Sequence, residues 1–181
     1  MAEAELPDEA QLGLRLPENS RPQRPVGFDL ETWAAAARFD IPERAASFIQ
    51  RVESAAEAYV VRELFRIPGV LYDGGASVYY HGAAIRLQVP ASVYRLDLVV
   101  QFEEIRLAVE IDGLEHHGLT QAQFARDYYR ARRLMIGGFV VVRFTASEAM
   151  TQPRQCWRDV FAILKTRSSI ERRPHTTGLP L

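Results

Sequence analysis

The chain has 181 residues, 48% hydrophobic and 25% charged, which is ordinary for a globular domain with a sizeable core. Its net charge of -1 excludes a uniformly basic surface, and its single cysteine, Cys156, excludes an intrachain disulfide and a multi-cysteine zinc site. Lys165 is the only lysine, so a catalytic lysine elsewhere is excluded. No apolar run is long enough to span a membrane and the N-terminus is acidic, so we expect a cytoplasmic protein.

The N-terminal part of the chain predicts a leader followed by helices. The leader is rich in Pro, Glu and Gln, a composition typical of disorder. Helical patterns follow over 29–39 and 42–66, and Ser54-x-x-Glu57 has the form of a capping box at which a helix restarts. The predicted divisions of the chain are a disordered leader (1–26), a helical extension (27–53), a main domain (54–167) and a flexible tail (168–181).

The main domain reads as an α/β unit. After a turn-rich break at 69–75, we predict strands near 84–89 and over 93–102 and 105–112, a helix over 120–136, a strand over 139–144 and a helix over 153–167. Gly137-Gly138 ends the first of these two helices. A strand that follows a crossover helix is expected to join the sheet in parallel, which predicts a mixed central sheet flanked by helices.

The strands at 93–102 and 105–112 form a hairpin that carries three acidic residues. Alternate residues of a strand face the same way. One apolar face is formed by Tyr94, Leu96, Leu98, Val100 and Phe102, and by Ile105, Leu107, Val109 and Ile111. Asp97, Glu110 and Asp112 fall on the other face. With a two-residue turn, Asp97 lies directly opposite Glu110, and a slip of one residue would turn an apolar set outward.

Opposed acids on a sheet need an explanation. Like charges that face each other destabilise a strand pair by up to ~1 kcal/mol, a cost that a divalent cation offsets. Magnesium is usually held by one or two protein carboxylates. The alternatives are that Asp97 and Glu110 face solvent, or that they pair with Arg95 and Arg106.

Four short motifs occur in order along the chain. They are Arg95-Leu96-Asp97; Glu110-Ile111-Asp112-Gly113, with His116-His117 just after; Asp127-x-x-Arg130-x-x-x-Leu134; and Gly138-Phe-Val-Val-Val-Arg143-Phe144. Over about 54–150, the chain resembles the PD-(D/E)XK nuclease superfamily, and more narrowly the uncharacterised domains related to the very-short-patch-repair (Vsr) endonuclease. The resemblance implies a restriction-endonuclease-like αβββαβα core. Glu57 matches a family glutamate on the first helix of that core and is expected to support the site.

The resemblance also implies a metal site. In the superfamily, an aspartate and an acidic residue on adjacent strands hold a divalent metal, and the matching residues here are Asp97 and Glu110, with Mg²⁺ or Mn²⁺ as the cofactor. Such an ion polarises the scissile phosphate and lowers the pKa of a bound water. Asp112 stands where the wider superfamily has a lysine, a departure that agrees with the narrower repair-like group. Asp112 either ligates the metal or orients water, or it pairs with Arg95.

Two histidines follow the acidic motif. An imidazole that titrates near neutrality suits a general base or acid in phosphodiester cleavage. We favour His116 as the catalytic residue, with His117 in support; the alternative is a pair of exposed loop histidines.

The helix predicted at 120–136 carries a file of arginines. Its expected core-facing stripe consists of Phe124, Tyr128, Ala131 and Met135. Arg126, Arg130 and Arg133 recur on another face, an arrangement that suits a phosphate backbone and also an ordinary solvated helix face. In the family pattern, Asp127 looks site-supporting. We expect phosphate contacts from Arg130, Arg143 and Arg126.

These observations favour an endonuclease that hydrolyses DNA phosphodiesters with magnesium or manganese, in repair or defence. One alternative is a non-catalytic module of the same fold that binds RNA or DNA. Another is an accessory protein of a defence or toxin–antitoxin system. Metal dependence separates the enzyme from the binding module, because a binder keeps its affinity in chelator.

Overall fold

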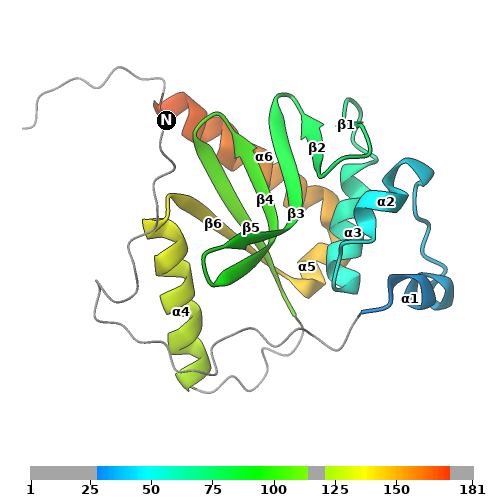
Figure 1. Ribbon diagram of the computed structural model, residues 1–181, viewed down its shortest axis with the longest axis horizontal. Helices are drawn as coiled ribbons and strands as arrows, with labels where there is room; N and C mark the ends of the chain where they lie inside the picture. The colour runs from blue at the N-terminus through cyan, green and yellow to red at the C-terminus, as the bar shows by residue number, and fades with distance from the viewer. Residues whose placement is uncertain (1–27, 114–120, 172–181) are drawn as a thin grey trace, which may run out of the picture.

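The computed structural model describes residues 28–113 and 121–171. It contains one six-stranded sheet with helices on both faces (Figure 1). The strands are β1 (Leu71–Tyr72), β2 (Ser77–Tyr80), β3 (Ala83–Ala91), β4 (Tyr94–Phe102), β5 (Ile105–Asp112) and β6 (Phe139–Thr145). They lie in chain order across the sheet; β1 to β5 are antiparallel neighbours and β6 is parallel to β5. The predicted α/β class with a mixed, helix-flanked sheet is confirmed.

The first two strands were not predicted. The hairpin between β2 and β3 turns at His81-Gly82, where both residues have positive φ, 47° and 83°. Left-handed conformations at both central positions fit the right-handed twist of a two-residue hairpin. The usual sequence signals for this turn are Asn-Gly and Asp-Gly. His-Gly is a weaker signal, and the hairpin could not be predicted from it.

The helices are α1 (Leu30–Ala37), α2 (Ala46–Ile49), α3 (Ala55–Leu64), α4 (Gln121–Ile136), α5 (Ala146–Thr151) and α6 (Pro153–Glu171), with a 3₁₀ turn over Glu43–Ala45. The predicted helix restart at Ser54 is confirmed, since the Ser54 hydroxyl accepts a hydrogen bond from the Glu57 N–H. The helix α6 runs four residues into the segment expected to be a tail, and the hydroxyls of Ser168 and Ser169 donate to the Lys165 carbonyl there. The predicted leader, His116 and His117 lie outside the described residues. None of the described helices is both long and apolar enough to cross a membrane.

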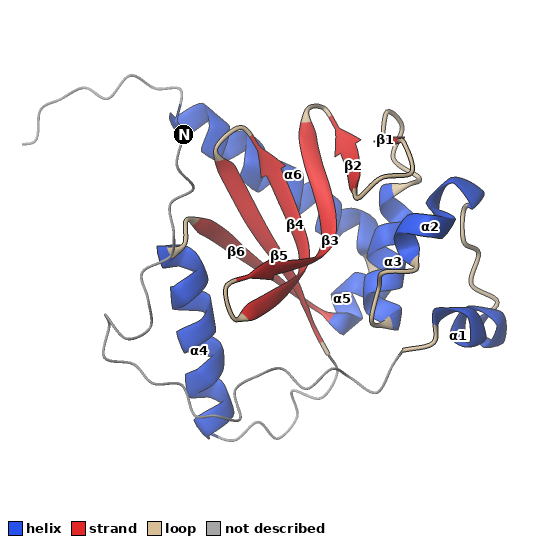
Figure 2. Cartoon of the chain, viewed as in Figure 1, coloured by secondary structure: helices blue, strands red, loops and turns tan. Residues whose placement is uncertain are grey.

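The main core lies between one face of the sheet and the helices α3, α5 and α6 (Figure 2). It includes Leu98, Val100, Leu107 and Val109 from the sheet, and Val61, Leu64, Trp157 and Val160 from the helices. The N-terminal segment joins the same core through buried side chains such as Phe48, Ile49 and Val52. A smaller cluster lies on the opposite face under α4, where Val99 and Ala108 meet Leu134.

The predicted hairpin register is confirmed. Phe102 pairs with Ile105, and the ladder continues in that register to Leu98 and Val109. The next pair would be Asp97 with Glu110, but the ladder ends before it. The site residues therefore lie where β4 and β5 part.

The predicted apolar face of β4 is only partly correct. Leu98 belongs to the main core, whereas Leu96 packs with Val99 in the cluster under α4. Strict alternation would place Leu96 beside Leu98. The strand therefore turns at Asp97, and the residues before it exchange faces.

The predicted core-facing stripe of α4 is only partly correct, since Ala131 lines the pocket against the sheet but two other members do not face it. Tyr128 and Met135, expected to face the core, are 66% and 55% exposed, while Arg133 and Leu134 are buried. The sheet presents Glu110 and Arg143 to this helix, so its polar side, with Asp127 and Arg130, turns inward to pair with them. Phe124 belongs to a part of the helix whose side chains are not described.

Trp157 joins α6 to α3 and gives a test of the main core. Its indole is 1% exposed, and Nε1 donates to the Val60 carbonyl at 2.8 Å. Trp157→Phe removes this hydrogen bond and leaves unfilled volume, so we expect the free energy of unfolding to fall by about 1–3 kcal/mol. Urea titration measures it. Trp33→Phe, at a half-buried tryptophan in the N-terminal segment, is the control and is expected to change stability less.

Candidate active site

Four carboxylates gather where the strands part. Asp97 comes from β4, Glu110 and Asp112 come from β5, and Glu57 comes from the first turn of α3. Asp97 spans the gap in the ladder, because its Oδ2 accepts a hydrogen bond from the Ile111 N–H at 2.7 Å. Burial raises the pKa of Asp97, while this hydrogen bond and the charge of Arg130 act in the opposite direction.

Glu110 is the most enclosed acid on the α4 side of the sheet. It is 5% exposed, and its Oε2 lies 2.7 Å from the guanidinium Nη2 of Arg130. Its other oxygen, Oε1, is buried and has no hydrogen-bond partner among the described residues. Burial raises the pKa of Glu110 to about 7, Arg130 opposes the rise, and the charge of Asp97 adds to it. The solvent-facing interpretation of Glu110 is therefore wrong, because the side chain is buried against Arg130.

The arginines of the site do not pair as the alternatives supposed. Arg106 donates to the Gly137 carbonyl at 2.7 Å, and Arg95 pairs with Glu53. Asp112 binds Arg143 in a bidentate arrangement, with N···O distances of 2.9 and 2.6 Å. The proposed pairs of Arg95 or Arg106 with the site acids are thus wrong, because these arginines have nearer acceptors.

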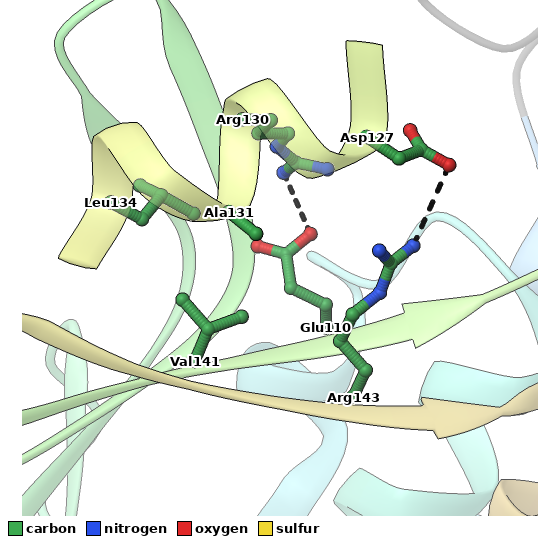
Figure 3. Close-up of a pocket in the computed structure, with 7 residues that line it drawn as sticks. All are labelled: Glu110, Asp127, Arg130, Ala131, Leu134, Val141 and Arg143. Carbon is green, nitrogen blue, oxygen red and sulfur yellow. Dashed lines mark ion pairs between the residues drawn. The ribbon is translucent and has the colours of Figure 1, made fainter. Parts of the chain in front are cut away.

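A narrow pocket opens between α4 and the sheet (Figure 3). Figure 3 shows Glu110 and Arg143 pointing from the strands toward Arg130 and Asp127 on the helix. Arg143 and Asp127 lie 3.9 Å apart, so Asp127 extends the chain of alternating charges. The free volume is about 10 Å³, which accommodates roughly one water molecule.

Glu57 joins the site from the other side of the sheet. It is 5% exposed, and burial followed by the charge of Asp97 raises its pKa to about 7. Its Oε2 accepts a hydrogen bond from the side-chain amide of Gln88 at 2.8 Å. Glu57 is a predicted site residue, whereas Gln88 is a partner of the site that the sequence does not predict. The one available signal was a polar residue between two apolar ones in a predicted strand.

The donor set suits a divalent cation, although the carboxylates do not converge on one point in this structure. Among the described residues, no group of three or more His, Cys, Asp or Glu side chains is arranged to hold a metal ion. Each acid instead has a protein partner: a backbone N–H for Asp97 and an arginine for Glu110 and for Asp112. However, Oε1 of Glu110 is buried and keeps no hydrogen-bond partner among the described residues. The chemistry of these oxygens fits Mg²⁺ or Mn²⁺.

Comparison with known proteins identifies a family resemblance. Residues 76–164 match the family model REase_MTES_1575, a restriction endonuclease-like family, in agreement with the PD-(D/E)XK superfamily. The matched segment contains Asp97, Glu110 and Asp112 but begins after Glu57. No curated protein and no solved structure matches the chain significantly.

Proposed function

We propose that the protein is a divalent-metal-dependent endonuclease that hydrolyses DNA phosphodiester bonds. The observation that carries the proposal is the pair Asp97 and Glu110 at the parting strands, in which Glu110 has a buried oxygen without a partner. The restriction endonuclease-like family match supports nuclease chemistry on nucleic acid. The Vsr-like resemblance supports a role in repair or defence.

Asp97 and Glu110 would hold the metal. A bound Mg²⁺ or Mn²⁺ supplies Lewis acidity toward the phosphate and lowers the pKa of water. Asp112, kept in place by Arg143, orients water toward the phosphorus. His116, which lies outside the described residues, is assigned the exchange of a proton with the attacking water or the leaving oxygen, and His117 is assigned a supporting role.

Arg130 and Arg143 are assigned to the phosphate backbone, with Arg126 at the exposed outer side of α4. In this structure, Arg130 and Arg143 bind carboxylates. A phosphate offers a guanidinium the same bidentate geometry as a carboxylate. Substrate binding is therefore an exchange of partners at Arg130, in which phosphate oxygens replace those of Glu110. Arg143 keeps Asp112 and contacts the phosphate with its remaining N–H donors.

The same pairs favour a second candidate, a nucleic-acid-binding module without catalysis. Arg130 and Arg143 already neutralise two of the acids, which removes part of the need for a cation. Such a module would bind DNA or RNA equally well in chelator.

The test is cleavage of supercoiled plasmid by the wild-type protein with Mg²⁺, with Mn²⁺ and with EDTA. We expect nicked and linear products with either metal and none in EDTA. Cleavage that persists in EDTA would contradict the metal role. Affinity for DNA that is unchanged in EDTA, together with no cleavage under any metal, would favour the binding module. A labelled RNA transcribed from the plasmid, incubated under the same conditions, shows whether the protein cleaves or binds RNA as well as DNA.

A further inference from the structure

Gln88 has an unusual backbone for its place in the fold. Five residues other than glycine have positive φ in the described part of the chain: Arg38, His81, Gln88, Ser92 and Glu103. Arg38 ends a helix, and three of the others lie in the turns of the β-hairpins, where left-handed conformations belong. Gln88, with φ of 51°, is the one of the five that lies inside a strand. A strained residue inside a strand persists only where the surrounding structure enforces it, and such residues concentrate at functional sites.

The strain coincides with a gap in the sheet. The β3–β4 ladder pairs Leu87 with Leu98 and Val89 with Leu96, and it omits Gln88 and Asp97 between them. Leu87 packs in the main core, whereas Val89 packs in the cluster under α4. The strand β3 therefore turns at Gln88 as β4 turns at Asp97, and both residues are released from the ladder at the site.

The freed side chain of Gln88 reaches the acid on α3. Its Nε2 donates to Oε2 of Glu57 at 2.8 Å. The other hydrogen bonds to this carboxylate come from the chain just before α3, from the Glu53 N–H at 3.0 Å and from the Ser54 hydroxyl at 2.9 Å. Gln88 is thus the described contact that ties the Glu57 carboxylate to the sheet.

We propose that Gln88 is a positioning residue, whose amide holds the Glu57 carboxylate beside Asp97 as a third acid of the cation site. This inference rests on the proposed metal-dependent function. Gln88 and Asp97 are omitted from the β3–β4 ladder at the same place, so the hydrogen bond from Gln88 holds the Glu57 carboxylate at the gap in which Asp97 lies. A cation at Asp97 and Glu110 then interacts with three carboxylates rather than two.

A substitution by glycine distinguishes the effect of the Gln88 side-chain amide from the effect of its backbone conformation. Gln88→Gly removes the amide, and glycine adopts positive φ without a steric penalty. We expect the urea concentration at the unfolding midpoint to stay close to that of the wild type, because relief of the backbone strain offsets the lost hydrogen bond. Mn²⁺ affinity, measured by calorimetry without substrate, is expected to fall about 10-fold, the loss typical of removing a group that orients a metal ligand. The kcat for plasmid nicking falls similarly, with KM for DNA unchanged.

Two comparisons make the result specific. Glu103→Gly changes a residue of the same backbone conformation in the β4–β5 turn and is expected to leave Mn²⁺ affinity and kcat unchanged. In a Glu57→Ala background, Gln88→Gly is expected to cause no further loss of Mn²⁺ affinity, because the acceptor of its amide is gone. A 10-fold loss of Mn²⁺ affinity in the Glu57→Ala background would overturn the inference. Unchanged Mn²⁺ affinity in the Gln88→Gly single variant would overturn it as well.

The wild-type protein separates this inference from the proposed function. If it binds Mn²⁺ but cleaves no DNA, only the proposed nuclease activity is contradicted. If it does not bind Mn²⁺, both the nuclease activity and the role of Gln88 are contradicted.

Discussion

Asp97→Asn is expected to reduce plasmid nicking in Mg²⁺ at least about 100-fold, since the Lewis acidity of a bound metal contributes several kcal/mol to the transition state. The substitution removes the charge of one of the two proposed ligands. Asparagine still offers an oxygen to the Ile111 N–H, which Asp97 binds at 2.7 Å. The fold is therefore expected to persist, and the lost activity can be attributed to the site. Initial rates of nicking, with thermal unfolding of both proteins, measure the effect.

The matched control is Asp40→Asn. Asp40 forms an ion pair with Arg66 at 3.5 Å and its side chain is 77% exposed, so the change is expected to affect neither stability nor cleavage appreciably. Equal nicking by the Asp97 variant and the wild type would remove Asp97 from the proposed metal site. Loss of nicking in both variants would point to a general effect of the preparation rather than to the site.

The metal-free protein is expected to lose stability as the pH rises from about 5 to 8. Burial and Asp97 raise the pKa of Glu57 from 4.5 to about 7. Between these two values the folded state holds a proton that the unfolded chain has released. Stability therefore falls as pH rises through this window, by on the order of 3 kcal/mol for Glu57. The raised pKa of Glu110 gives a contribution of the same sign.

Glu57→Gln removes the buried charge, so this variant is expected to be more stable than the wild type at pH 8 and similar to it at pH 5. Urea titrations at the two pH values measure this difference. Mg²⁺ is expected to stabilise the wild type more at pH 8 than at pH 5, because it binds the ionised acids. Glu148→Gln is the contrasting control. Hydrogen bonds from Thr145 lower the pKa of that exposed carboxyl, so its removal is expected to give no gain at pH 8. A wild type equally stable at both pH values would contradict the assignment.

The hairpin at the centre of the site could be predicted because its evidence is local. Apolar alternation on two adjacent strands favours one register, and the observed ladder follows it from Phe102 and Ile105 to Leu98 and Val109, which brings Asp97 and Glu110 to its end. The parallel position of β6 followed from the crossover helix in the same way. Both inferences needed only the spacing of residues along the chain.

The partners of the site residues could not be predicted, because they depend on how separate elements pack. Arg130 pairs with Glu110 only once α4 has turned its polar side to the sheet. The helix pattern alone favoured a different orientation, with the apolar side chains of Tyr128 and Met135 toward the core, whereas both are exposed. Gln88 was missed for a related reason: its importance comes from a positive φ and a contact to α3, and neither leaves a periodic signal.

The shared core of the N-terminal helices and the sheet sets the size of the smallest autonomous folding unit. A fragment limited to residues 76–164, the family-matched segment, would lack α3 and with it Val61, Leu64 and the acid at Glu57. Even a fragment that begins at residue 54 would remove Phe48, Ile49 and Val52 and expose the apolar surface they cover. Domain boundaries for recombinant expression therefore belong upstream of Leu30, where α1 begins. A transplant of the nuclease-like segment into another protein would need this helical cover as well.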